Sequence, residues 1–322
     1  MMLSVWRIRS SIVTAAVAGA VLVPAAVAQG VPRTLALERA ATSVAARDGV
    51  VIWSRFDATR KTYSLLKSVD GGAPTRIRVG PRAKGPFDID LGTNGSGATY
   101  AVYTRDDGDI YRLNVASGSE LKVVKLSSPT IEERDPTIMR GEIAFVRRTR
   151  GYDELRIGNT SGASKGSRLI VKHRSIVSAE LSLTHVAYVV TGPGPISADG
   201  AKSVRVRDLR TGADKQVYRA VSTGANVAIV TRPTYVASPQ GFMWARANIG
   251  ADTGQRFVRY TLRDSQLDYA QGSPFVTSTA WAGTLLGAAT SSAFQDTDAC
   301  DDETVNICRV QLSGPLEFTH GP

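Results

Sequence analysis

Hydrophobic residues beyond position 40 come in short runs, in which apolar and polar side chains alternate, and Gly, Asp, Asn and Pro separate the runs. Almost no stretch repeats its apolar positions at helical spacing. A period of two is typical of β-strands with one buried face, and the intervening residues are those that favour turns. The pattern predicts an all-β chain.

The runs repeat as a unit in which a strand ends at a glycine turn. Gly71, Gly118, Gly162 and Gly212 follow one another at steps of 47, 44 and 50 residues, and the 102 residues from Gly212 to Gly314 equal two steps of 51. A period of this length predicts radial or linear repetition of one supersecondary unit.

Each unit supplies four strands, and the second strand is a continuous apolar run of the kind that suits burial on both faces. These runs are residues 50–53, 99–103, 143–146, 186–190, 242–245 and 285–289. The strands that end at the turns are residues 63–71, 110–118, 155–162, 204–212, 258–262 and 305–310. The pattern predicts a six-bladed β-propeller of four-stranded antiparallel blades. Because strand spacing alone does not fix closure, two β-sandwiches are the alternative.

Two turns resemble the Ser-Pro-Asp-Gly turn of TolB-like propeller repeats. Residues 47–49 (Arg-Asp-Gly) precede the apolar run at Val50, and residues 238–241 (Ser-Pro-Gln-Gly) precede the run at Phe242. Residues 87–92 (Phe-Asp-Ile-Asp-Leu-Gly), followed by 101–105, resemble a group of secreted actinobacterial propellers without an assigned activity. The resemblance implies a six-bladed propeller that binds envelope proteins, and it brings no catalytic residues.

The N-terminus has the form of an export signal. Arg7 and Arg9 precede an apolar run over residues 12–28, which ends in Ala-Val-Ala. Small residues in that triplet suit signal peptidase, so we expect a Sec-type signal peptide over residues 1–28, an N-terminal segment over 29–39 and one propeller domain over 40–322. Retention of the run as an anchor is the alternative, but its 17 residues are short for a membrane span. We expect a secreted or cell-envelope protein with no membrane span after cleavage.

The two cysteines, Cys300 and Cys308, are eight positions apart. In an oxidising compartment such a pair favours a local disulfide, and two reactive thiols are the alternative.

The net charge of the chain excludes few classes of function. The chain has 39 Lys and Arg residues against 29 Asp and Glu, a formal net charge of +10 that is spread along the sequence. This charge favours contact with anions, but the basic runs lack the interleaved aromatic residues that stack bases, so we expect no nucleic acid partner.

Three His and two Cys are too few for a dedicated zinc or iron site. We expect no cofactor, and the only calcium candidates, which are weak, are Asp296, Asp298, Asp301, Asp302 and Glu303.

Export, repetition and the lack of a catalytic constellation predict a scaffold that binds an envelope or extracellular protein, or a small ligand, as a monomer. The alternative is a metal-assisted hydrolase or lactonase that uses carboxylates at the propeller channel. Its candidate residues are Asp88, Asp90, Glu132, Glu133, Asp135 and Glu180.

In a propeller, the loops between the second and third strands lie on the same face as the links between blades. The long segments of this chain fall mainly in that group: residues 80–86, 127–136, 192–202, 248–255 and 291–304. Long loops on a rigid scaffold often carry recognition, and tolerated insertion without function is the alternative. We therefore expect a partner on this face, with Cys300 and Cys308 stiffening its rim. The predicted polar contacts are Arg82, Lys84, Glu132, Glu133, Arg134 and Arg232.

Overall fold

The computed structural model describes residues 33–38, 42–128, 130–160, 166–192, 201–221, 227–237, 240–249, 256–271, 276–281, 292–296, 308–313 and 319–320. The elements in these ranges are β-strands, which confirms the all-β prediction. Within them, no helix has the length and apolar character needed to cross a membrane.

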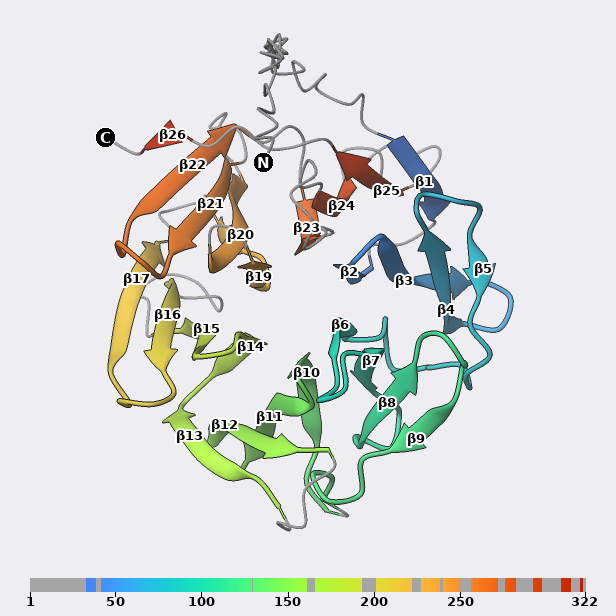
Figure 1. Ribbon diagram of the computed structural model, residues 1–322, viewed down its shortest axis with the longest axis horizontal. Coiled ribbons are helices and arrows are strands. Elements are labelled where there is room, and N and C mark those ends of the chain that lie inside the picture. The colour runs from blue at the N-terminus through green and yellow to red at the C-terminus, as the bar shows by residue number, and fades with distance from the viewer. Residues whose placement is uncertain are drawn as a thin grey trace, which may run out of the picture.

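The strands of the described residues form antiparallel sheets around a central axis (Figure 1). The first four-stranded sheet contains β2 (Val44–Arg47), β3 (Val50–Asp57), β4 (Thr62–Val69) and β5 (Thr75–Arg76). The second contains β6 (Asp90–Thr93), β7 (Thr99–Thr104), β8 (Ile110–Asn114) and β9 (Glu120–Lys122). The third contains β10 (Glu133–Met139), β11 (Glu142–Thr149), β12 (Tyr152–Asn159) and β13 (Arg168–His173). The fourth contains β14 (Ile176–Leu181), β15 (His185–Thr191), β16 (Lys202–Asp208) and β17 (Asp214–Ala220).

The next sheet departs from this pattern because it has six strands. They are β18 (Val227–Val230), β19 (Thr234–Ala237), β20 (Gln240–Ile249), β21 (Arg256–Thr261), β22 (Leu267–Gln271) and β26 (Thr319–His320). Both β18 and β19 pair with β20, at opposite ends of that strand. Pro233 lies in the gap between them, where its ring removes a backbone donor from the ladder. β26 adds to the outer strand β22.

The ring closes through a sheet made from both ends of the described chain. It contains β23 (Val276–Trp281), β24 (Ser292–Asp296), β25 (Cys308–Ser313) and, outermost, β1 (Arg33–Glu38). β1 lies in the segment that the sequence analysis placed before the propeller, and it pairs with β25 from Arg33↔Leu312 to Glu38↔Cys308. The strand predicted at residues 285–289 lies outside the described residues. Among the described strands, β24 lies between β23 and β25.

The propeller prediction is confirmed, but the prediction of six four-stranded blades is wrong. Five sheets have four strands each, and the remaining sheet has six. The sequence pattern could not reveal this difference because the split inner strand and the added outer strand arise from pairing between segments.

Hydrophobic clusters fill the spaces between adjacent sheets. One cluster contains Ile52 and Leu65 from the first sheet together with Phe87, Leu91 and Tyr103 from the second sheet and the link before it. The second strand of each four-stranded sheet from β2 to β17 is covered on both faces, as its continuous apolar sequence predicts.

Tight hairpin turns join the first and second strands of two of the sheets. Asp48 and Gly49, between β2 and β3, both have positive φ angles of 48° and 79°. Arg140 and Gly141 form the equivalent turn between β10 and β11, with φ angles of 48° and 83°. Two successive left-handed residues are what a tight hairpin turn requires, and glycine at the second position meets that demand without strain.

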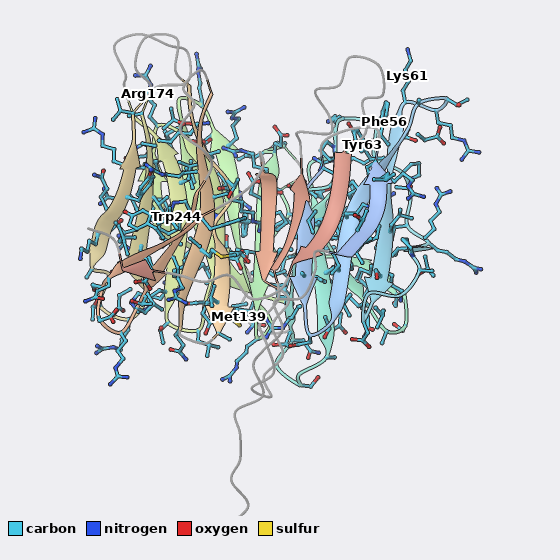
Figure 2. All side chains as sticks on the ribbon, turned by 90° about the horizontal axis from the view of Figure 1, so that it is seen from above. Phe56, Lys61, Tyr63, Met139, Arg174 and Trp244 are labelled. Carbon is cyan, nitrogen blue, oxygen red and sulfur yellow. The ribbon has the colours of Figure 1, made fainter. Side chains whose placement is uncertain are left out.

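The described links between sheets and the described loops between second and third strands lie on one face of the propeller, the linking face. In Figure 2, Lys61 in the β3–β4 loop and Arg174 in the β13–β14 link lie at the upper side, and Met139 lies at the opposite side.

Candidate functional site at the central channel

The innermost strands bring charged side chains together at the axis, and Arg232 lies among them. Its Nε donates to Ala179 O at 3.2 Å, and its terminal nitrogens donate to Ile89 O at 3.4 Å and Pro136 O at 2.8 Å. These carbonyls belong to three other sheets or the links that enter them, and Arg232 itself joins β18 to β19. One guanidinium therefore connects the second, third and fourth sheets with the six-stranded sheet that carries Arg232.

Four carboxylates lie near enough to this arginine to act on its charge: Asp88, Asp90, Asp135 and Glu180. Although burial opposes its charge, these carboxylates raise the pKa of the Arg232 guanidinium. Glu180 Oε2 lies 3.8 Å from the Arg232 terminal nitrogen. The arginine therefore remains charged, and it balances part of the negative charge that the inner strands collect.

The carboxylates also bind groups of their own protein. Asp88 accepts hydrogen bonds from the Thr104 backbone and hydroxyl at 2.8 Å and from Asp135 N at 2.8 Å. Arg82 lies 3.2 Å from Asp88, and Arg134 lies 2.8 Å from Asp135. These contacts fix the side chains between neighbouring sheets.

A second set of contacts repeats from sheet to sheet. Asp90 Oδ2 accepts from Ile138 N at 2.8 Å, and Thr137 Oγ1 accepts from Leu181 N at 3.1 Å. Glu180 Oε1 accepts from Tyr235 N at 3.1 Å. In each case a side chain of one inner strand holds the backbone of the next inner strand. These three hydrogen bonds are the inner latches of the ring.

Burial controls the protonation of the channel acids. Burial and the nearby Asp90 carboxylate raise the pKa of Glu180 to about 8. Burial likewise raises the pKa of Asp135, and the Asp88 carboxylate acts in the same direction. Glu180 is therefore mostly protonated at neutral pH, which lowers the negative charge around Arg232.

The channel carboxylates are engaged by groups of the protein itself. Among the residues that the structure describes, no group of three or more His, Cys, Asp or Glu side chains is placed to hold a metal. The channel carboxylates bind backbone N–H groups and arginines instead. We call Arg232 and the four carboxylates near it the polar plug, because their contacts link neighbouring sheets at the axis.

The structure places the predicted polar contacts in three environments. Lys84 and Glu132 are exposed on the linking face. Arg82, Glu133 and Arg134 form contacts inside the protein, and Arg232 lies in the channel. Burial raises the pKa of Glu133 to about 6, and the carboxylate bonds to Arg147 Nε at 2.9 Å.

The remaining candidates lie at or beyond the limits of the described residues. Only the backbone is described for Asp296, which ends β24, and for Cys308, which begins β25. The predicted partners of these residues lie outside the described ranges, namely Cys300, Asp298, Asp301, Asp302 and Glu303. The disulfide and the calcium site therefore stay predictions.

The sequence reasoning missed the role of Arg232 and the basic character of the linking face. The pattern Asp135-Pro136-Thr137 recurs as Arg232-Pro233-Thr234, and this similarity could have placed Arg232 on an inner strand. Exposed basic residues gather in the loops and links of the linking face and at the adjoining end of β11: Arg60, Lys61, Lys84, Arg148, Arg150 and Arg174.

Comparison with known proteins identifies the fold. No protein-family model matches the chain, and neither does any curated protein. An oligogalacturonate lyase in complex with manganese aligns at 11% identity with a TM-score of 0.50, over 85% of this chain and 81% of its own. A puromycin hydrolase aligns at 12% identity with a TM-score of 0.51, over 80% of this chain and 50% of its own. This chain therefore spans about half the length of that hydrolase. These neighbours are β-propellers, and at such low identity the likeness establishes for this chain a β-propeller fold and nothing more.

Proposed function

We propose that this chain is an exported β-propeller that binds an acidic envelope or extracellular partner through its linking face. The observation that carries the proposal is the polar plug in the channel. Asp88, Asp135 and Glu180 bind arginines and backbone groups of the protein itself, which favours a structural role for the channel. Recognition is then left to the outer surfaces.

The charge of the linking face supports an acidic partner. Arg150 and Arg174 are exposed, and neither forms an ion pair within the described part of the chain. Lys84 is also exposed, and its ammonium group donates to Asp106 O at 2.6 Å. Exposed basic groups on a rigid rim attract acidic surfaces and speed association at low ionic strength.

The alternative of a metal-assisted hydrolase is less well supported. Four of its six candidate carboxylates do meet at the channel: Asp88, Asp90, Asp135 and Glu180. However, Arg232 lies among them with its charge retained, and a guanidinium repels a metal cation. The binding proposal requires no change in these contacts.

The test compares two double charge-reversal variants. Arg150→Glu with Arg174→Glu should weaken capture of partners from envelope and culture-medium extracts at about 50 mM NaCl, and about 300 mM NaCl should weaken wild-type capture too. Arg140→Glu with Arg210→Glu is the matched control, because both arginines are exposed in turns on the opposite face. Equal capture by both variants, with unchanged melting temperatures, would refute the proposal.

A further inference from the structure

A pocket on the linking face lies apart from the channel. It has a volume of about 260 Å³ and is lined by His173, Val190, Gly192, Ala201, Ser203, Arg205, Gln216 and Arg219. Its residues come from the end of β13 and from β15, β16 and β17, so it lies between the third and fourth sheets. The volume is below the range of roughly 300–1,000 Å³ that is usual for sites of drug-sized ligands. The pocket therefore suits a smaller molecule.

Strand register explains how the polar lining residues meet. Ser203 pairs with Val190 on one side and with Arg219 on the other. Arg205 pairs in the same sheet with Gln216. Residues directly opposite each other on neighbouring strands project from the same face of a sheet, and so do residues two apart on one strand. The two rows thus present two arginines, a hydroxyl and an amide to one space.

The charge of the lining indicates a monoanion. Arg205 Nε already bonds to Asp214 Oδ1 at 3.0 Å and to the Tyr188 hydroxyl at 3.2 Å. Asp214 therefore offsets part of the Arg205 charge, and it shares its carboxylate with Arg207, which lies 3.6 Å from Asp214 Oδ2. Arg219 forms no ion pair among the described residues and is exposed. Among the described residues that line the pocket there is no Asp or Glu. The Arg219 charge therefore remains without a fixed counterion among the described residues.

The groups around this charge indicate what the anion carries. No hydrogen bond within the described residues uses the terminal nitrogens of Arg205, and a guanidinium edge matches the two oxygens of a carboxylate. Ser203 and Gln216 can exchange hydrogen bonds with hydroxyl groups, while Val190 and Ala201 offer apolar contact to carbon atoms. We propose that this pocket binds a small hydroxylated monocarboxylate of the sugar-acid class. The inference goes beyond the proposed function, because it depends on the pocket alone.

The test uses the full chain and sodium gluconate as the probe, measured by isothermal titration calorimetry at pH 8. Gluconate should bind at one site, and glucose, its uncharged relative, should give no saturable binding. Arg219→Ala should weaken gluconate binding by about tenfold or more, because it removes the unbalanced charge. Arg150→Ala is the matched control, since Arg150 is an exposed arginine on the same face outside the pocket. It should leave the affinity unchanged.

Several outcomes would overturn the inference: no gluconate binding, equal binding of glucose, or equal weakening by both variants, which would indicate diffuse attraction to a basic surface. Tighter binding of inorganic phosphate, mainly a dianion at this pH, would overturn the assignment to a monocarboxylate. Because Arg219 is exposed, its variant should keep the wild-type melting temperature. Loss of gluconate binding with partner capture intact would refute only the pocket, whereas loss of charge-dependent capture with gluconate binding intact would refute only the proposed function.

Discussion

Single residues at the axis combine burial with charge, and Glu180 is the clearest example. Its side chain is 8% exposed, and it bonds to Tyr235 N while lying 3.8 Å from Arg232. Burial in a folded protein disfavours a carboxylate, and the neighbouring Asp90 adds repulsion. The residue therefore links the pH of the solution to the stability of the ring.

We expect Glu180 to make the protein more stable at low pH than at high pH. Its pKa in the folded state is about 8, against 4.5 for an ordinary glutamate. Below pH 4.5 both folded and unfolded states hold the proton, and as pH rises to 8 only the unfolded state releases it, so stability falls. Glu180→Gln should reduce the loss of unfolding free energy between pH 5 and pH 8 by on the order of 1–3 kcal/mol, as measured by urea unfolding.

The control for this prediction is Glu154→Gln, because Glu154 lies on β12, away from the inner strand β10, and pairs with Arg156 at 2.6 Å. Its substitution should leave the pH dependence between these values almost unchanged. Identical pH profiles for wild type and Glu180→Gln would contradict the raised pKa of Glu180.

Between elements, the inner latches join one strand to the next. Thr137 on β10 is fully buried, and its hydroxyl accepts from Leu181 N on β14 at 3.1 Å while donating to Glu180 Oε2 at 3.2 Å. Hydrophobic clusters hold neighbouring sheets together, but apolar contacts are tolerant of small sliding movements. A directed hydrogen bond to a backbone N–H fixes which residues of adjacent inner strands lie side by side.

Thr137→Val should therefore destabilise the protein although it keeps the shape of the side chain. Loss of the hydroxyl leaves Leu181 N without its acceptor, at an expected cost of about 1–3 kcal/mol in unfolding free energy. Thr75→Val on the exposed strand β5 is the matched control and should change stability by less than about 0.5 kcal/mol. Both are measured by denaturant unfolding, and equal effects would show that the latch contributes little.

For the whole molecule, closure of the ring depends on strand β1. Its Glu38 is buried and accepts from Trp53 Nε1 at 2.7 Å and from Arg55 Nε at 3.0 Å, both on β3 of the next sheet. β1 also pairs with β25. One strand thus connects the last sheet in sequence with the first, so the two ends of the described chain depend on each other for stability.

Glu38→Ala should lower the free energy of unfolding by about 2 kcal/mol, because it leaves the buried indole N–H of Trp53 without an acceptor. Glu38→Gln should cost less, since its amide oxygen can still accept from Trp53. Hydrogen exchange should report faster opening of β1 and β25 in the alanine variant than in the wild type. If exchange rises equally in all sheets, β1 does not act as a local closure element.

The sequence by itself determined the fold class and most strands. Alternation of apolar and polar residues depends only on which face of a strand is buried, so β3, β4, β7, β8 and β11 lie where the pattern places them. Lys84 and Glu132 are likewise exposed in the links over residues 80–86 and 127–136, where the sequence predicts polar contacts on the surface.

The tertiary structure decided the closure and the site. β1 pairs with β25, and β18 and β19 both pair with β20. The local sequence pattern of a strand does not indicate which other strand it pairs with. Glu133, Arg134 and Arg232 are charged residues, and the sequence predicts them on the surface. In the structure each forms hydrogen bonds with residues distant in sequence, which allow it to lie inside the protein. A charge can be buried only where opposite charges and carbonyls converge, and that convergence is a property of the folded ring.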